Sequence, residues 1–400
     1  MTPEPQRLLS RQFVVVTAAC AAFFVSFGST IPVLPRYVSD ALDQGDVVVG
    51  LVAGSFAVSG ILLRPFIGLI GDRHGRRALI VVGAILTALG HLGHVLADTV
   101  PLLVVMRLII GAGQAAFFVG AATLVADLAP PARRGEAASY FSVALYLGLG
   151  IGPFIGERLL AAVSFDAVWL FATGGGVVAA ALGATLPARV PSPVVEGAVP
   201  QRAGRGPMFH PAGVGPGAVL GLGVLGFVGF NTFVPLFAEG IGIDDVAPVF
   251  LVYSLVVVTV RVLGARLPDR LGPARAGTAA LAASGGGLVL VAVWQSPLGL
   301  YLGTAVLALG SSLLYPALMA AAVNAVGDDE RSQVVATFTM FFEIGTAAGG
   351  LTLGAVAAAS SYAGAFVAGA ASAAAGLALL RLWLVPRLRA AAPASAARTS

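Results

Sequence analysis

Charged residues gather in one short stretch of an otherwise apolar chain. Gly68 to Arg77 reads GLIGDRHGRR and holds the carboxylate of Asp72 together with Arg73 and Arg76. A carboxylate and guanidinium groups at this spacing can form ion pairs and can bond to the ends of helices. The stretch is therefore a candidate for a contact that holds two segments together reversibly.

A second candidate group is a carboxyl in an apolar run. Glu343 lies in TMFFEIGTA, about ten residues from one end of that run, which is ~15 Å along a helix. Ionisable residues inside a membrane span are costly and are functional candidates by default. Glu343 is our first candidate for a group that takes up and releases a proton. The alternative is a neutral Glu343 that bonds to a neighbouring helix.

Arg107, in RLIIGAGQA, is a further candidate. It either faces the protein interior, where it binds an anion or keeps a proton carrier ionised, or it extends to the nearby interface. His91 and His94 share a helix face, but with no third ligand nearby we expect no metal site. Weaker candidates for lining a cavity, each of which could equally bond between helices, are Gln114, Tyr146, Asn231 and Tyr315.

The composition places these residues in a membrane. Of the 400 residues 58% are hydrophobic and only 10% are charged, and the mean hydropathy is +0.94. The net charge of +4 does not indicate nucleic-acid binding, because the arginines lie in short intervals between apolar runs. With Cys20 alone, no intramolecular disulfide or cysteine metal site can form. No Walker sequence is present, and we expect no cofactor.

Runs of roughly 20 apolar residues, enough to cross a bilayer as helix, predict an all-α membrane protein with twelve transmembrane helices. A Pro-, Gly- and Arg-rich interval, 187–216, predicts a cytoplasmic linker between bundles at 1–186 and 217–400, the second with a short cytoplasmic tail. The expected spans are 13–36, 47–70, 78–97, 101–125, 137–161, 165–186, 217–238, 246–266, 275–294, 298–323, 333–357 and 361–384.

The distribution of arginine predicts the orientation. With the N-terminus inside, eighteen of the 23 arginines fall on the cytoplasmic side and two, Arg36 and Arg158, fall outside. This asymmetry favours cytoplasmic N- and C-termini in the cell or inner membrane. The expected outer loops are acidic, with Asp40, Asp43, Asp46, Asp98, Glu157, Asp166, Glu239, Asp244 and Asp245.

The two halves repeat at an offset of 197 residues. Arg64 matches Arg261 and Asp72 matches Asp269, and the same offset holds from the second to the fifth helix of each half. Two pseudo-symmetric six-helix bundles in parallel orientation follow, and such repeats place a substrate path between them. The other matches are Arg73 with Arg270, Gly75 with Gly272, Gly113 with Gly310, Arg134 with Arg331, Phe141 with Phe338, Gly148 with Gly345 and Gly152 with Gly349.

GLIGDRHGRR, with Gly68, Gly75 and Arg77 at the motif positions, resembles the loop between the second and third helices of the major facilitator superfamily. The resemblance covers nearly the whole chain. It implies that Asp72 bonds to the cytoplasmic end of the span 333–357 and that Arg76 pairs with Asp127, so that the stretch latches the cytoplasmic side. Alternatively, its arginines only set the orientation.

The second copy of the motif, ARLPDRLGPAR, keeps Asp269 and Arg270 but contains two prolines, and Asn324 stands at the position of Asp127. We expect a weaker or purely structural contact there.

The segment LYLGLGIGPFIGE resembles the fifth-helix signature of antiporter branches of this superfamily. It carries Gly148, Gly152, Pro153 and Gly156. Small residues allow close approach of helices, and proline removes a backbone hydrogen bond, which would help to seal the path against proton leak. The alternative is that these residues serve packing alone, because glycine and proline are common in spanning helices.

The resemblance implies a secondary transporter, not an enzyme. We expect it to act as a monomer that exports a small organic molecule, a drug or a metabolite, in exchange for protons by alternating access. A solute importer or facilitator of the same fold is the main alternative. A membrane-embedded sensor or enzyme is disfavoured, because the loops are short and no nucleophile and base stand together.

Overall fold

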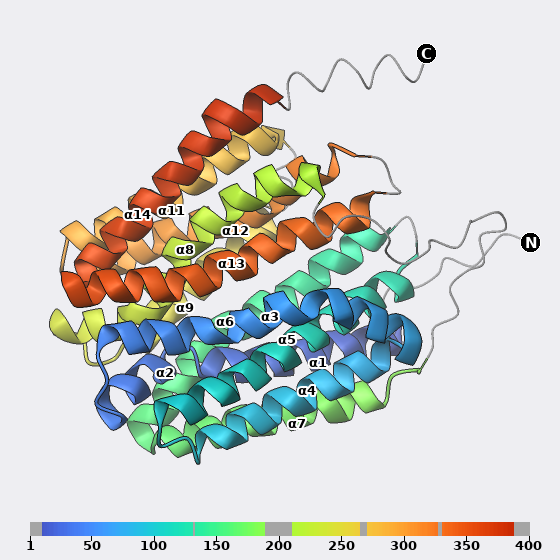
Figure 1. Ribbon diagram of the computed structural model, residues 1–400, viewed down its shortest axis with the longest axis horizontal. Helices are drawn as coiled ribbons and strands as arrows, with labels where there is room; N and C mark the ends of the chain where they lie inside the picture. Colours follow the sequence, from blue (N-terminus) through green and yellow to red (C-terminus); the bar gives the residue numbers. More distant parts are fainter. Residues whose placement is uncertain (1–9, 131–132, 189–209, 265–269, 327–329, 388–400) are drawn as a thin grey trace, which may run out of the picture. The chain divides into compact units, whose positions relative to one another are not determined.

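The computed structural model describes residues 10–130, 133–188, 210–264, 270–326 and 330–387 (Figure 1). Within these ranges the chain is helical. Its long helices are α1 (Arg11–Ser29), α3 (Asp46–His74), α4 (Arg76–His94), α5 (Val100–Leu128), α6 (Arg134–Ala162), α7 (Phe165–Ala184), α8 (Pro211–Gly240), α9 (Ala247–Leu263), α11 (Pro273–Val293), α12 (Pro297–Val323), α13 (Arg331–Ala359) and α14 (Tyr362–Leu379). Eleven helical segments in the described ranges are long and apolar enough to cross a membrane, and α9 is a shorter apolar helix of 17 residues.

Most helix starts follow from local sequence. The hydroxyls of Ser10, Ser164, Ser296 and Ser361 each accept a hydrogen bond from a backbone N–H three residues on. Proline occupies the first turn of α5, α8, α9, α11 and α12, where its missing N–H costs nothing. Serine caps and proline thus mark the starts of most of these helices.

Two boundaries differ from the sequence prediction. The expected span 13–36 is broken, because α1 ends at Ser29 and the chain resumes as α2 (Val33–Arg36) and a π turn, η1 (Tyr37–Ala41). Pro32 lies in the break and cannot donate a backbone hydrogen bond. In addition, α8 begins at Pro211 instead of 217, so that the end of the expected linker is helical. The rest of that linker, 189–209, lies outside the described residues.

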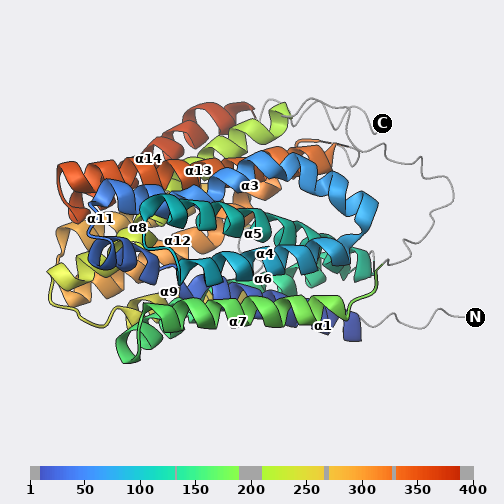
Figure 2. The same ribbon diagram turned by 60° about the horizontal axis from the view of Figure 1, so that its bottom comes forward.

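The helices form two compact units. The first comprises residues up to Val33 together with Val58–Arg205, and the second comprises Leu34–Ala57 and Gly206 onward. The boundary passes through α3, whose first twelve residues group with the second unit. Within that unit α14 lies beside α11 and α8 (Figures 1 and 2).

The sequence repeat reappears as matching close contacts inside each unit. In the first, a Cβ added to Gly113 of α5 would lie 2.6 Å from the Gly83 carbonyl oxygen of α4. In the second, a Cβ added to Gly310 of α12 would lie 2.5 Å from the Ala280 carbonyl oxygen of α11. Both pairs obey the 197-residue offset. Each helix pair therefore packs backbone against backbone at a glycine, as small residues allow in membranes.

Candidate functional site

The charged stretch at 68–77 is mainly helical. Gly68, Asp72 and Arg73 all belong to α3, which continues to His74, and the chain turns at Gly75 with φ of +87°. A Cβ added to Gly75 would lie 2.6 Å from the Ala188 carbonyl oxygen. Both the left-handed backbone and this contact require glycine. The turn sets the first residue of α4, Arg76, directly after the end of α3.

Arg76 lies beside Asp127 near the end of α5. Its Nε is 3.6 Å from Asp127 Oδ2, and the two side chains are about one-third exposed, at 30% and 34%. Arg77 Nη1 donates to the Leu186 carbonyl oxygen at 3.5 Å, and Arg73 is exposed. The side chain of Asp72 lies outside the described residues, so its expected bond to the end of α13 stays a prediction.

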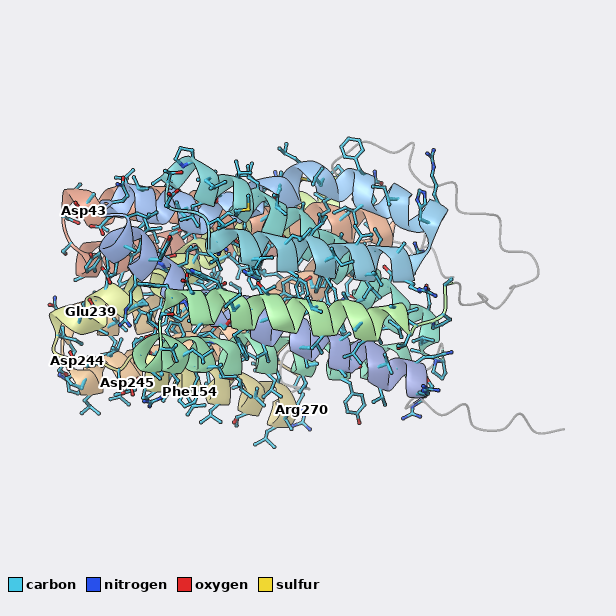
Figure 3. The ribbon with its side chains drawn as sticks, turned by 90° about the horizontal axis from the view of Figure 1, so that it is seen from below. Asp43, Phe154, Glu239, Asp244, Asp245 and Arg270 are labelled. Carbon is cyan, nitrogen blue, oxygen red and sulfur yellow. The ribbon has the colours of Figure 1, made fainter. Side chains whose placement is uncertain are left out.

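The second copy of the motif shares the turn. Gly272 has φ of +74° directly before α11, as Gly75 has before α4. Arg270 is exposed (Figure 3), whereas Asp269 lies outside the described residues. Asn324, at the position of Asp127, caps the end of α12.

The glycines of the fifth-helix signature form the contact between α6 and α1. A Cβ added to Gly148 would lie 2.7 Å from Phe24 Cβ, and one added to Gly152 would lie 2.6 Å from the Val25 carbonyl oxygen. A Cβ on Gly156 would overlap the Ser29 carbonyl group. Pro153 lies inside α6, and its Cδ would be 3.1 Å from a Cβ added to Gly28. Any side chain at these positions would push α6 off α1.

The equivalent glycines of α13 face α8 in the second unit. A Cβ added to Gly345 would lie 2.5 Å from the Gly221 carbonyl oxygen, and one on Gly349 would lie 2.9 Å from that of Leu225. The α6–α1 and α13–α8 pairs are therefore related by the repeat, and proline distinguishes only the first.

Glu343 is a buried carboxylate in the middle of α13, with 4% of its surface exposed. Two residues before it, Phe341 packs against Gly217 of α8. Three residues after it, the Thr346 hydroxyl donates to the Phe342 carbonyl oxygen at 2.9 Å. The predicted burial of Glu343 inside a span is present in the structure.

Arg107 is buried inside the first unit with 5% exposure, which disfavours the alternative that it extends to the interface. His91 and His94 of α4 lie within electrostatic range of its guanidinium and have no exposed surface. Their ring nitrogens find no hydrogen-bond partner among the described residues, and the His94 ring meets Trp169 edge-on at 4.9 Å. Among the described residues no three His, Cys, Asp or Glu side chains gather as a metal site would need.

The four cavity candidates are half-buried. Two of them, Asn231 and Tyr315, make contacts within their own unit. Asn231 Nδ2 donates to the Phe227 carbonyl oxygen of its own helix at 2.9 Å. The Tyr315 ring meets Phe338 edge-on at 5.3 Å. For Gln114 and Tyr146, on α5 and α6, a role in a cavity stays a prediction.

Sequence reasoning placed Glu157 in an outer loop, which is wrong. The residue lies within α6, five residues before its end, and is only 4% exposed. The expected span 137–161 already includes position 157, and α6 continues to Ala162, so Glu157 belongs to the span and not to the loop. Glu157 is thus a second buried carboxylate, in addition to Glu343.

One set of contacts was not anticipated from the sequence. It lies at the end of the second unit that carries Asp43, Glu239, Asp244 and Asp245 (Figure 3), which we call the acidic end. There Arg36 Nε of α2 is 2.9 Å from Glu239 Oε1 in the last turn of α8.

A hydrogen bond and a glycine seam continue this contact along α3. The Tyr362 hydroxyl of α14 donates to Asp46 Oδ1 at 3.1 Å. A Cβ on Gly50 would overlap the Gly350 carbonyl oxygen of α13, and one on Gly350 would lie 2.9 Å from the Gly54 nitrogen. Together with the ion pair Arg36–Glu239, these form what we call the acidic-end latch. Its available sequence signal was the G-x-x-x-G spacing at 50–54 and at 350–354.

Comparisons with known proteins agree with this fold. The chain matches the Major Facilitator Superfamily over residues 16–294 and 249–400. It is 28% identical to the uncharacterised MFS-type transporter YhhS of Escherichia coli K12, over 95% of this chain and 93% of YhhS. An uncharacterised MFS-type transporter of Salmonella typhimurium is 26% identical over 92% of this chain and 95% of its own length.

Solved structures show the same architecture. A bacterial homologue of the human lysosomal transporter Spinster, in an inward-facing and unoccupied conformation, superimposes with a TM-score of 0.74 at 16% identity. The match covers 97% of each chain. The chain belongs to the major facilitator superfamily and is a multi-pass membrane transporter. The expected fold class is thereby confirmed.

Proposed function

We propose that this chain exports a small organic molecule in exchange for protons by alternating access. The observation that carries the proposal is Glu343, a carboxylate buried in the middle of a spanning helix. An ionisable group there is expensive to maintain, and a proton-coupled carrier uses such a group to exchange a proton with its substrate. Arg107, buried in the other unit, is the second group that we assign to proton coupling.

Two sets of contacts at opposite ends of α3 support alternating access. Asp46 and Gly50, in its first turns, belong to the acidic-end latch. Arg73 lies in the last turn of α3, and Arg76 beyond the turn pairs with Asp127. Since the arginines favour the second end as the cytoplasmic one, we assign the acidic end to the outer face. A transport cycle would then open the two ends in turn.

The fifth-helix glycines support export over import. In the antiporter branches that α6 resembles, close packing at this signature would help to seal the path against proton leak. Here Gly148, Gly152 and Gly156 bring α6 against α1 with no room for a side chain. We therefore favour antiport. The experiment must distinguish it from import or facilitated transport by the same fold.

The experiment uses inverted membrane vesicles with an acidic lumen and a panel of drugs, sugars, amino acids and siderophore-like compounds. An exporter dissipates the proton gradient when its substrate is added outside, because substrate enters as protons leave. A proton symporter dissipates the gradient only when substrate is loaded inside. Dissipation by an external compound supports export, and dissipation confined to loaded vesicles contradicts it.

The variant Glu343→Gln tests whether Glu343 couples transport to protons. We expect it to lose compound-dependent dissipation while it keeps its level in the membrane. Glu157→Gln is the matched control, because Glu157 is as deeply buried as Glu343, each being 4% exposed. Full dissipation in Glu343→Gln would remove this carboxylate from the coupling mechanism.

A further inference from the structure

Four exposed arginines gather where α11 begins and α14 ends. Arg270 precedes α11 and Arg275 lies in its first turn. Arg381 and Arg387 lie at the end of the chain's last described helix. We call these four residues the α11–α14 basic surface. They play no part in the proposed transport mechanism, apart from Arg270 as a motif position.

The two helices are antiparallel neighbours at this surface. A Cβ added to Gly277 of α11 would lie 3.1 Å from Leu380 Cδ2 at the end of α14. Arg275 is two residues from Gly277 and Arg381 directly follows Leu380. Because the α-helix rises 1.5 Å per residue, the backbones of Arg275 and Arg381 lie at nearly the same height along the two helices.

A π turn shapes the end of α14. Over η3 (Leu380–Leu384) Leu380 and Leu384 are buried, whereas Leu382 is 80% exposed and Trp383 is 39% exposed. The Trp383 ring packs close to Gly215 of α8, and the Arg387 guanidinium lies 3.8 Å from its centroid. An exposed leucine, a half-exposed tryptophan and arginines in succession are typical of the boundary between acyl chains and headgroups.

Among the described residues, α11 and the last helix, up to Arg387, contribute no carboxylate to this surface. The sequence contains no Asp or Glu from Arg270 to Val326, or from Ser361 to Arg387. The carboxylate of Glu330, at the start of α13, is paired instead with His210, with Oε1 3.7 Å from His210 Nε2. No ion pair joins Arg270, Arg275 or Arg381 to another described residue. Arginines that only set the orientation need not lie close together. These four lie where α11 begins and α14 ends, next to the exposed Leu382.

We infer that the α11–α14 basic surface binds the headgroup of an anionic phospholipid. Arg275 and Arg381 would contact the phosphate and the charged headgroup, since guanidinium matches phosphate geometry in two hydrogen bonds. The exposed Leu382 would contact the acyl chain. Basic pockets between spanning helices bind anionic lipids by this combination of charge and apolar contact.

Trp383 provides the reporter. The chain has three tryptophans, of which Trp169 is fully buried and Trp294 lies at the other end of α11. With Trp294 changed to Phe, the protein is reconstituted in bilayers of equal amounts of phosphatidylglycerol and phosphatidylcholine. Bromine is placed on the acyl chains of one lipid or of the other. The ratio of the two quenching curves gives the enrichment of the anionic lipid at Trp383.

We expect enrichment of at least about fivefold, the effect of a single arginine near an anionic lipid surface. It should fall to parity in Arg275→Gln/Arg381→Gln. The matched control Arg11→Gln/Arg133→Gln removes two exposed arginines elsewhere and should keep it. Arg275→Lys/Arg381→Lys keeps the charge and should also keep most of it. Arg387 is left intact because it contacts the reporter ring.

Equal quenching by the two lipids in the parent protein would overturn the inference. Enrichment that survives in Arg275→Gln/Arg381→Gln, or that is lost equally in the control pair, would also overturn it. Because the readout is lipid binding at Trp383, it does not depend on substrate or on proton coupling.

Discussion

Arg36 Nε lies 2.9 Å from Glu239 Oε1, with side chains that are 10% and 45% exposed. This ion pair joins the break after α1 to the last turn of α8. Together with the neighbouring contacts of Asp46 and Gly50, the ion pair explains why Leu34–Ala57 group with the second unit. In the sequence these residues come before Val58–Arg205, which belong to the first unit.

Loss of the ion pair should loosen this end. In Arg36→Gln we expect amide hydrogen exchange over residues 234–246 to rise about threefold, because a partly exposed pair contributes up to ~1 kcal/mol. The swap Arg36→Glu/Glu239→Arg should restore slow exchange. Arg158→Gln removes an exposed arginine of α6 and should leave exchange over 234–246 unchanged. Fast exchange in the swap would show that charge pairing is not what holds this end.

The glycine seam should tolerate no side chain. In Gly350→Ala the new Cβ would overlap the Gly50 carbonyl oxygen, so α3 and α13 must move apart. Overpacking of this kind costs about 1–3 kcal/mol, and we expect exchange over residues 46–57 to rise about tenfold or more. Gly286→Ala is the control, because a Cβ there meets nothing within 4 Å. Equal exchange in the two variants would contradict the seam.

The Asp46–Tyr362 hydrogen bond should appear as an energetic coupling. Tyr362→Phe keeps the stacking on Phe233, whose ring centroid is 5.8 Å away, and removes only the hydroxyl. In a cycle of Tyr362→Phe, Asp46→Ala and the double variant we expect a coupling of about 1–2 kcal/mol in the free energy of unfolding. Tyr301→Phe in combination with Asp46→Ala should be additive. Additivity of the first pair would show that the bond contributes nothing.

The Arg76–Asp127 pair should matter for transport more than for insertion. We expect Asp127→Asn to lower substrate-dependent proton exchange about fivefold, a change of ~1 kcal/mol, at an unchanged level in the membrane. This variant leaves every arginine in place, so the positive charge that orients the chain is preserved. The swap Arg76→Asp/Asp127→Arg should recover part of the loss. Normal exchange in Asp127→Asn would favour the view that these arginines only set orientation.

Much of the architecture was determined by the sequence itself. In a bilayer each backbone N–H and C=O must be bonded within its own segment, so apolar length alone predicts helices such as α5 and α12. The 197-residue repeat predicted which glycines are equivalent, and Gly113 and Gly310 make matching contacts. The burial of Glu343 followed equally from its place inside an apolar run.

Only the tertiary structure decided which helix faces meet. Lipid is as apolar as leucine, so the sequence of a helix that is apolar on every face does not indicate which face packs against protein. The burial of His91 and Glu157 therefore needed the structure, as did the pairing of Tyr362 with Asp46 across 316 residues. The sequence determined which segments cross the membrane, because that depends on each segment alone. The contacts of the acidic-end latch depend on how separate helices pack, which no single segment encodes.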